Sequence, residues 1–318
     1  MTARPRRRRL LAVGASLGLA LAVTATLPRH ALATASAAPN PVCGWATGAP
    51  PAHFDHVVLL IFENKWRDQI FTGSNAPYLQ SLAADCGRAT NMSTVDPKTS
   101  LPNYIALTSG YTGYPTHITS NRNPNTWPQS STSIFEQLGS DWRELVESMP
   151  SPCYIHHATD YTVNHNPAPY YTHLAHTTCP TNDVPMPATP DLSASFTVLT
   201  PNKTHIMHKP DSGSSVSQAQ RIRNGDTWAA QYLPKVFATP EYQAGRTVVI
   251  ITWDEGNTSH QVVPFIVASA YTPAGYSTNA ALDHFSTLKG MEQMLGLPLL
   301  GHAGDAGTAS IRDYFGLS

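Results

Sequence analysis

Two short, largely apolar runs each end abruptly in side chains that carry oxygen ligands. Residues 57–62 read Val-Val-Leu-Leu-Ile-Phe and are followed by Glu63 and Asn64. Residues 247–253 form a similar run, nearly 200 positions later, and are followed by Asp254 and Glu255. Apolar runs of this length are typical of strands buried on both faces of a parallel sheet. We therefore predict an α/β fold in which both strands deliver acids to one edge.

The carboxyl edge of an open α/β sheet is where ligands bind. Carboxylate and amide oxygens are suitable ligands for a hard divalent cation, which makes Glu63, Asn64, Asp254 and Glu255 candidate metal ligands. A single acid after a strand is more often a solvated loop residue or a helix cap. The repetition of the pattern is what favours a site.

The first residues form a pattern typical of an export signal. Arg4 and residues 6–9 are a basic head, residues 10–27 are an apolar run of 18, and small-residue sites follow at 31–33 and 35–37. We predict that residues 1–37 are a signal peptide and residues 38–318 a single domain, secreted outside the cell or associated with the wall. An uncleaved membrane anchor is the alternative, and the twin arginines leave two export routes open.

Removal of the basic head changes the charge of the protein. The whole chain carries 20 basic and 21 acidic residues, and six of the basic ones lie in the first 33 residues. The remainder is therefore acidic, at about −7. An acidic chain without a basic stripe is not expected to bind nucleic acid. A phosphate site is still compatible with this charge, because a bound metal reverses the local field.

Four cysteines in an exported chain predict two disulfides. Of the three possible connectivities we favour local pairing, Cys43 with Cys86 and Cys153 with Cys179. None of the spacings is typical of a zinc cluster.

Periodicity and capping residues predict further elements around the two strands. Helices are expected over residues 76–84, 133–148, 228–237 and 280–295, and a strand over 262–268. Asn75 is expected to cap the first helix, and residues 224–226 to introduce the third. Residues 150–210 are rich in proline, histidine and tyrosine with weak periodicity, which favours functional loops.

Ser100 lies in a segment whose backbone is fixed by Pro97 and Pro102. The apolar run after Asn103 predicts a helix that ends at Gly110. Ser100 would then stand at the entrance of a helix, where backbone N–H groups and the dipole stabilise an anion. A plain N-cap serine is the alternative interpretation. A hydroxyl beside a divalent cation can ionise and attack phosphorus, which predicts phosphoryl transfer through a phospho-enzyme.

Ten short motifs in order carry a resemblance to a known family. They are residues 57–64, 75–79, 100–104, 142–150, 165–167, 201–202 with 207–208, 225–228, 252–255, 284–288 and 295–298. Together they resemble the secreted phosphoesterase family that contains bacterial and fungal acid phosphatases and phospholipases C, a branch of the alkaline-phosphatase-like superfamily. The resemblance runs from about residue 54 to about residue 301.

The resemblance implies a three-layer α/β/α sandwich with a mostly parallel central sheet and the metal at its carboxyl edge. It assigns metal binding to Glu63, Asn64, Asp254 and Glu255, with Ser100 as ligand and nucleophile in preference to Thr99. Histidines that contact phosphate or protonate the leaving group match His165, His208 and His284. The chain departs from the family pattern at residues 98–99 and 205–209, which bears on the phosphate contacts and the substrate.

The leading hypothesis is a secreted, metal-dependent phosphomonoesterase of the acid phosphatase type. The alternatives are a phospholipase C or phosphodiesterase and a non-catalytic extracellular module that binds phosphate. Contact with a membrane is expected only if the protein is a phospholipase. The expected substrate is a small phosphate ester, and the cofactor a divalent ion: calcium, magnesium, manganese, iron or zinc. The sequence does not indicate which oligomeric state the protein has.

Overall fold

A nine-stranded sheet runs through the part of the chain that the computed structural model describes, residues 41–112, 118–208 and 214–318. The strand order is β4-β3-β5-β1-β6-β7-β2-β8, and β9 pairs with β2. β7 is antiparallel to both of its neighbours, and the other pairings are parallel. The strands are β1 (His56–Phe62), β2 (Gly87–Ser93), β3 (Trp142–Val146), β4 (Asp183–Pro185), β5 (Phe196–Thr200), β6 (Thr247–Trp253), β7 (Val262–Ser269), β8 (Tyr276–Thr278) and β9 (Leu282–Asp283).

The two predicted site-bearing strands are neighbours in the middle of this sheet. β1 and β6 pair in parallel from His56 opposite Thr247 to Phe62 opposite Trp253. Every residue of β6, and every residue of β1 after His56, is buried, as expected for strands covered on both faces. The prediction that both strands deliver their acids to one edge is confirmed.

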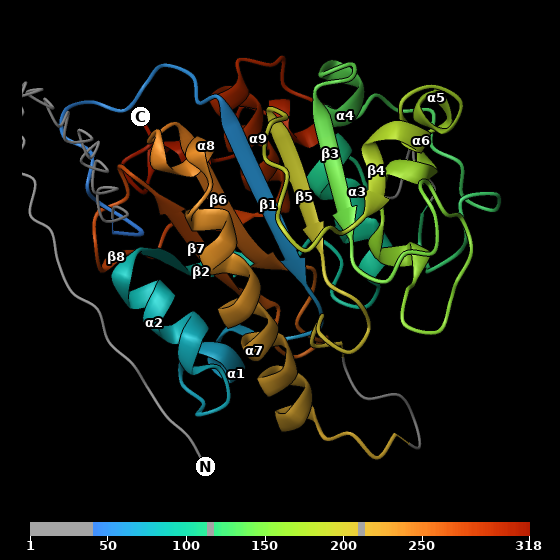
Figure 1. Cartoon of the computed structure of the whole chain (residues 1–318), viewed down its shortest axis with the longest axis horizontal. Helices are drawn as coiled ribbons and strands as arrows, with labels where there is room; N and C mark the ends of the chain where they lie inside the picture. Colours follow the sequence, from blue (N-terminus) through green and yellow to red (C-terminus); the bar gives the residue numbers. More distant parts are fainter. Residues whose placement is uncertain (1–40, 113–117, 209–213) are drawn as a thin grey trace, which may run out of the picture. The chain divides into compact units, whose positions relative to one another are not determined.

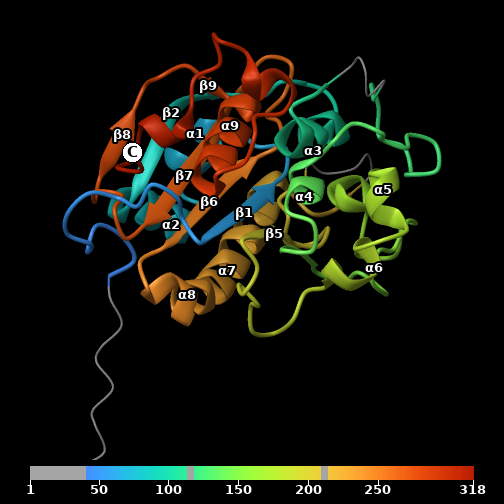
Figure 2. The same ribbon diagram turned by 90° about the horizontal axis from the view of Figure 1, so that it is seen from above.

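Helices cover both faces of the sheet. Figures 1 and 2 show α2, α7 and α8 on one face and α3 and α9 on the other; α2 packs against α7, and α3 against α9. The three-layer α/β/α prediction is confirmed. The helices are α1 (Arg67–Phe71), α2 (Pro77–Asp85), α3 (Ser100–Ser109), α4 (Ile134–Gln137), α5 (Thr172–Ala175), α6 (Cys179–Asn182), α7 (Gln218–Phe237), α8 (Pro240–Gln243) and α9 (His284–Leu295), with 3-10 turns η1 (Val163–His165), η2 (Ala168–Tyr170), η3 (Gly301–Gly304) and η4 (Ile311–Asp313).

One predicted helix is wrong. Residues 133–148 form a single turn, α4, and then strand β3. Gly139, at φ +64, follows α4 and directs the chain into the sheet. Trp142 and Leu145 are buried, but from a strand that has both faces covered. A short apolar segment satisfies helical and strand periodicity alike, which explains the error.

Two helix starts also differ from prediction. α7 begins at Gln218 with Ser217 as N-cap, so residues 224–226 lie inside it. Asp226 instead accepts the backbone N–H groups of Tyr78 and Leu79, at 3.1 and 2.9 Å, and so caps α2 in place of Asn75. α9 begins at His284, four residues later than predicted, with Asp283 as its capping residue.

Both predicted disulfides are present, Cys43–Cys86 and Cys153–Cys179. The chain divides into two units, Met1–Ala38 and Pro39–Ser318. The predicted signal peptide, residues 1–37, lies outside the described residues, and the domain boundaries remain predictions. Within the described ranges, no helix combines the length and the apolar character that crossing a bilayer requires.

Candidate active site

The polar residues after β1 and β6 are joined directly to one another. The Asp254 N–H donates to Phe62 O at 3.0 Å, which continues the pairing of the strands by one residue. The Asn64 N–H donates to Asp254 Oδ1 at 2.9 Å, and Asn64 Nδ2 donates to Glu255 Oε1 at 2.6 Å. Asn64 has φ +49, a conformation that asparagine tolerates better than most residues. The structure thus brings the predicted residues of the two strand ends together.

Ser100 lies at the same edge and is the first residue of α3. Its hydroxyl donates to Glu63 Oε2 at 2.9 Å, and the residue is only 2% exposed. The next N–H, that of Leu101, donates to Asn121 Oδ1. Thr99 precedes the helix and makes no side-chain cap. Ser100 is therefore the hydroxyl that faces the acids, at a helix end that favours an anion.

Asn103 fixes the loop that leads to Ser100, a role that the sequence did not reveal. Its Oδ1 accepts the Thr94 hydroxyl at 3.0 Å and the Asp96 N–H at 2.9 Å. Its Nδ2 donates to the carbonyl oxygen of Thr99 at 3.0 Å. The sequence shows Pro102 and Asn103 two and three residues after Ser100, and this set of loop contacts is the physical reason for the asparagine.

His165 and His208 lie on the other side of Glu63. His165 Nε2 is 3.0 Å from Glu63 Oε1, and the two imidazole rings are 5.9 Å apart. Glu63, His165 and His208 place ligand atoms within 4.8 Å of one another and could hold a metal ion. The sequence predicted these histidines as phosphate contacts or proton donors, so their proximity to Glu63 adds a second possible role.

His284 lies behind Asp254. Its Nε2 donates to the main-chain oxygen of Asp254 at 2.6 Å, and the Thr94 hydroxyl donates to the same oxygen at 3.0 Å. The imidazole is fully buried, and burial lowers its pKa. In this position His284 orients the end of β6. Among the described residues, no hydrogen bond joins His284 to Ser100.

The electrostatics of the acids suit a cation. Burial raises the pKa of Glu63 well above its usual range, and the charges of Asp254 and Glu255 raise that pKa further. Burial also raises the pKa of Asp254 to about 6. Asp254 Oδ2 is buried and has no hydrogen-bond donor among the described residues. A divalent ion would remove this mutual repulsion, so the donor set fits a hard metal.

Lys65 is a further component that sequence analysis missed. Its side chain is fully buried, and Nζ donates to Asn64 O at 3.0 Å and to Met207 O. The end of β1 is thereby tied to the segment that carries His208. Gly225 lets α7 approach this segment, because a Cβ there would lie 2.4 Å from Met207 Cγ. A lysine after an apolar strand normally indicates a solvated residue, so no local signal revealed this one.

The sequence and the fold of this chain are similar to those of known phosphoesterases. Residues 68–298 match the Phosphoesterase family. The chain belongs to this family. It is a hydrolase that acts on phosphoric ester bonds. The matched residues include Ser100, His165 and Asp254, whereas Glu63 and Asn64 precede the matched region.

A phosphatidylinositol-3-phosphatase of Mycobacterium tuberculosis is 28% identical over 290 residues, which cover 90% of this chain and 91% of that protein. Among solved structures, a protein of the alkaline phosphatase superfamily from Vibrio parahaemolyticus aligns with a TM-score of 0.54 at 11% identity, covering 81% of this chain and 69% of the other. A murine ectonucleotide pyrophosphatase/phosphodiesterase aligns with a TM-score of 0.55 at 10% identity, covering 79% and 97%. The fold of this phosphoesterase is that of the alkaline phosphatase superfamily.

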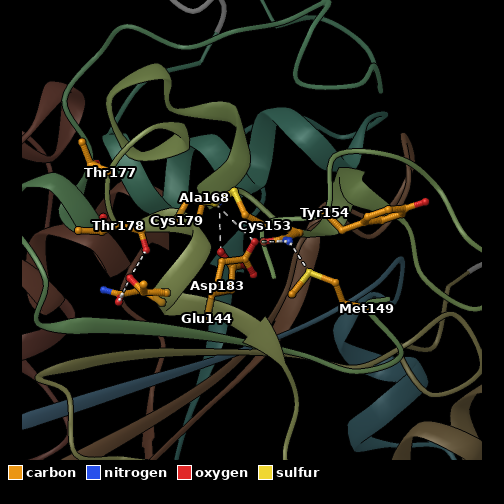
Figure 3. Close-up of a disulfide and its surroundings, with 12 residues drawn as sticks. Glu144, Met149, Cys153, Tyr154, Ala168, Thr177, Thr178, Cys179 and Asp183 are labelled. Atoms are coloured by element: carbon orange, nitrogen blue, oxygen red, sulfur yellow. Dashed lines mark hydrogen bonds between the residues drawn. A yellow bond between two sulfur atoms is a disulfide. The ribbon is translucent and has the colours of Figure 1, made fainter. Parts of the chain in front are cut away.

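A separate pair of buried acids supports the segment that carries His165 (Figure 3). Glu144 and Asp183 lie opposite each other on β3 and β4. Glu144 Oε2 accepts the Ala168 N–H at 3.1 Å, and Asp183 Oδ2 accepts from Asn166 Nδ2 at 3.0 Å. Burial raises the pKa of both carboxyls, that of Asp183 to about 8, and the charge of Asp183 further raises the pKa of Glu144.

This pair predicts a pH-dependent stability. The pKa of Asp183 is about 8 in the folded state against an ordinary value of 3.8, so the folded protein holds more protons across this window. The free energy of unfolding should therefore fall as pH rises from about 4 to about 8, by up to about 1.4 kcal/mol per pH unit for one proton. Asp183→Asn should make this slope shallower in denaturant unfolding, while exposed Asp85→Asn should not. Equal slopes in wild type and Asp183→Asn would contradict the account.

Proposed function

We propose that this phosphoesterase is a secreted, metal-dependent phosphomonoesterase of the acid phosphatase type, with Ser100 as nucleophile. The observation that carries the proposal is the position of Ser100 Oγ, 2.9 Å from Glu63 at the entrance of α3. The relative named as a phosphatidylinositol-3-phosphatase supports a monoester substrate. Secretion is supported by the pattern of residues 1–37 and by the two disulfides.

The residues that would hold the ion are Glu63, Asn64, Ser100, Asp254 and Glu255. A divalent cation at this position lowers the pKa of a nearby hydroxyl and neutralises charge on the phosphoryl oxygens. Carboxylate, amide and hydroxyl oxygens favour calcium, magnesium, manganese or iron, while His165 and His208 beside Glu63 would also suit zinc. A cavity of about 490 Å³, lined in part by Asn64, Lys98 and Glu255, gives access to these ligands from solvent.

The side chains of this site suggest a two-step reaction. Ser100 passes its proton to Glu63 Oε2 and attacks phosphorus, which leaves phosphate on Ser100 while the N-terminus of α3 stabilises its charge. His165 donates a proton to the leaving alcohol and His208 contacts the phosphoryl oxygens. In the second step His165, which lost its proton in the first, takes a proton from water as that water attacks phosphorus; the Oγ–P bond breaks, Glu63 returns its proton to Ser100 Oγ and inorganic phosphate leaves. His284 holds the main chain of Asp254 in place and takes no proton in this scheme.

A substrate panel with metal analysis tests the proposal. Protein purified without chelators should contain a divalent metal and hydrolyse p-nitrophenyl phosphate with a kcat/KM at least about 100 times that for bis(p-nitrophenyl) phosphate, because the site is expected to recognise a terminal phosphate. Preference for the diester or for phosphatidylcholine would instead indicate a phosphodiesterase or phospholipase C. Absence of turnover on every ester, in protein that binds phosphate, would leave a binding module.

A further inference from the structure

A basic cavity of about 260 Å³ adjoins the proposed catalytic residues. Its walls include Asn121, Asn164, His165, Lys203, His208 and Arg221. Two described contacts link it to the nucleophile. His165 Nε2 lies 3.0 Å from Glu63, which accepts the hydroxyl of Ser100, and Asn121 Oδ1 accepts the N–H of the residue after Ser100.

Lys203 is held in this wall by uncharged groups. Its Nζ donates to the carbonyl oxygens of Ala158 and Thr159, at 3.0 and 3.3 Å. None of the ion pairs among the described residues involves this lysine. Lys203 and the proposed proton donor His165 line the same cavity.

Arg221 lies in the first turn of α7 and faces the same cavity. Its Nη2 donates to the Ser214 hydroxyl at 2.9 Å, and its Nε is buried without an acceptor among the described residues. A buried guanidinium donor without an acceptor is costly, and an oxyanion would satisfy it. The described part of the chain also gives Arg221 no carboxylate partner.

We propose that this cavity is a subsite for a second anionic group of the substrate, held by Lys203 and Arg221, so that the preferred substrates are phosphate monoesters whose alcohol carries another phosphate. The inference rests on the proposed function and adds a substrate class to it. A volume of about 260 Å³ suits a compact group and not a whole large substrate.

Lys203 and Arg221 share the cavity with His208, which contacts the reacting phosphate in the proposed reaction, but in the described part of the chain they do not contact the nucleophile or the proposed metal-binding acids. That phosphate must lie at Ser100, among Glu63, Asp254 and Glu255, and no described hydrogen bond or ion pair joins Lys203 or Arg221 to any of these four residues. The neighbouring arginine on α7 offers a contrast. Arg223 is exposed and already donates to Asn75 and Gln220. The cavity can therefore hold a second charge beside the phosphate that His208 contacts.

The test compares a small monoester without a second charge, a small monoester with one, and a lipid monoester with one. Steady-state kcat/KM is measured for propyl phosphate, for propane-1,3-diyl bisphosphate, and for phosphatidylglycerol phosphate in phosphatidylcholine vesicles, which carries a diester and a terminal monoester. Lys203→Met and Arg221→Met should each lower kcat/KM about 10-fold to 100-fold for a substrate with a second anionic group, as expected for loss of a charge-assisted hydrogen bond, and leave propyl phosphate within about 3-fold.

Matched variants control for charge and for folding. Arg223→Met removes an arginine from α7 outside the cavity, and Lys235→Met removes an exposed lysine that, like Lys203, donates to a main-chain carbonyl. Both should behave as wild type on all three substrates. Arg221→Lys should recover part of the loss. If Lys203→Met does not fold, the two Arg221 variants still decide the question, because the described side-chain contact of Arg221 is with exposed Ser214.

The substrates on which the two variants lose kcat/KM show which kind of molecule supplies the second anionic group. Loss on the soluble bisphosphate alone assigns the subsite to small metabolites, loss on the vesicle substrate alone assigns it to lipid headgroups, and loss on both supports the shared chemistry. Equal losses on propyl phosphate and the bisphosphate would show that the cations hold the reacting phosphate and would overturn the proposal, as would no loss on any substrate. A wild-type protein inactive on propyl phosphate would instead contradict the proposed function.

Discussion

Ser100→Ala is expected to lower kcat by roughly four to six powers of ten, the size of effect that follows removal of a covalent nucleophile. The Ser100 hydroxyl is the one that donates to Glu63, and it stands where the N-terminus of α3 stabilises an incoming phosphate. Substrate binding should change far less, because the phosphate contacts made by other groups remain. Single-turnover and steady-state kinetics would measure the two effects separately.

Thr99→Ala is the matched control for this variant. Thr99 is the adjacent hydroxyl, and it provides no side-chain cap to α3. Loss of its hydroxyl should alter kcat less than about 10-fold, since the described hydrogen bonds of Thr99 are made by its main chain: its oxygen accepts from Asn103 and its N–H donates to Asp96 Oδ1. Near-normal turnover in Ser100→Ala, or a collapse of turnover in Thr99→Ala, would contradict the assignment of the nucleophile.

Asp254→Asn should lower metal content and activity together, with kcat/KM reduced at least about 100-fold. The fold should survive, because an asparagine Oδ1 can still accept the Asn64 N–H that now reaches Asp254 at 2.9 Å. The stability of the metal-free protein should not decrease, since the substitution removes one of the charges that raise the pKa of Glu63. Elemental analysis, activity and denaturant unfolding on the same preparation provide the measurements.

Glu292→Gln controls for the loss of any buried acid. Glu292 is buried on α9, accepts the Leu300 N–H at 3.0 Å and has a pKa that burial raises to about 8, but it lies outside the proposed ligand set. Its substitution should leave metal content unchanged. Full metal occupancy with normal turnover in Asp254→Asn would remove Asp254 from the proposed site.

The part of the site that sequence reasoning found shares one physical feature. Glu63 and Asp254 follow apolar runs that are typical of buried strands, and parallel strands deliver their next residues to a common edge. Ser100 was found because prolines and a following apolar run indicated a helix start, which the structure confirms. Local patterns were sufficient to place these residues at the ends of elements, whereas the assignment of their proposed roles came from the family resemblance.

The rest depends on contacts between distant segments, which leave no local pattern. Lys65 is buried because Met207, 142 residues away, offers it a carbonyl oxygen. Glu144 and Asp183 are buried because β3 and β4 pair in register, and the amphipathic pattern over residues 133–148 concealed the first of these strands. His284 lies on a helix, as expected, although that helix begins four residues later than predicted. Its partner is the main-chain oxygen of Asp254, just after β6, which periodicity could not identify.

The most direct test of this account is to trap the phospho-enzyme. The purified protein would be mixed with a phosphate monoester labelled on phosphorus, quenched at low pH and digested, and the labelled peptide sequenced by mass spectrometry. The account predicts stoichiometric label on Ser100, and none in Ser100→Ala. Label on Thr99 or on a histidine, or full turnover without any trapped label, would contradict the central claim even with the metal site intact.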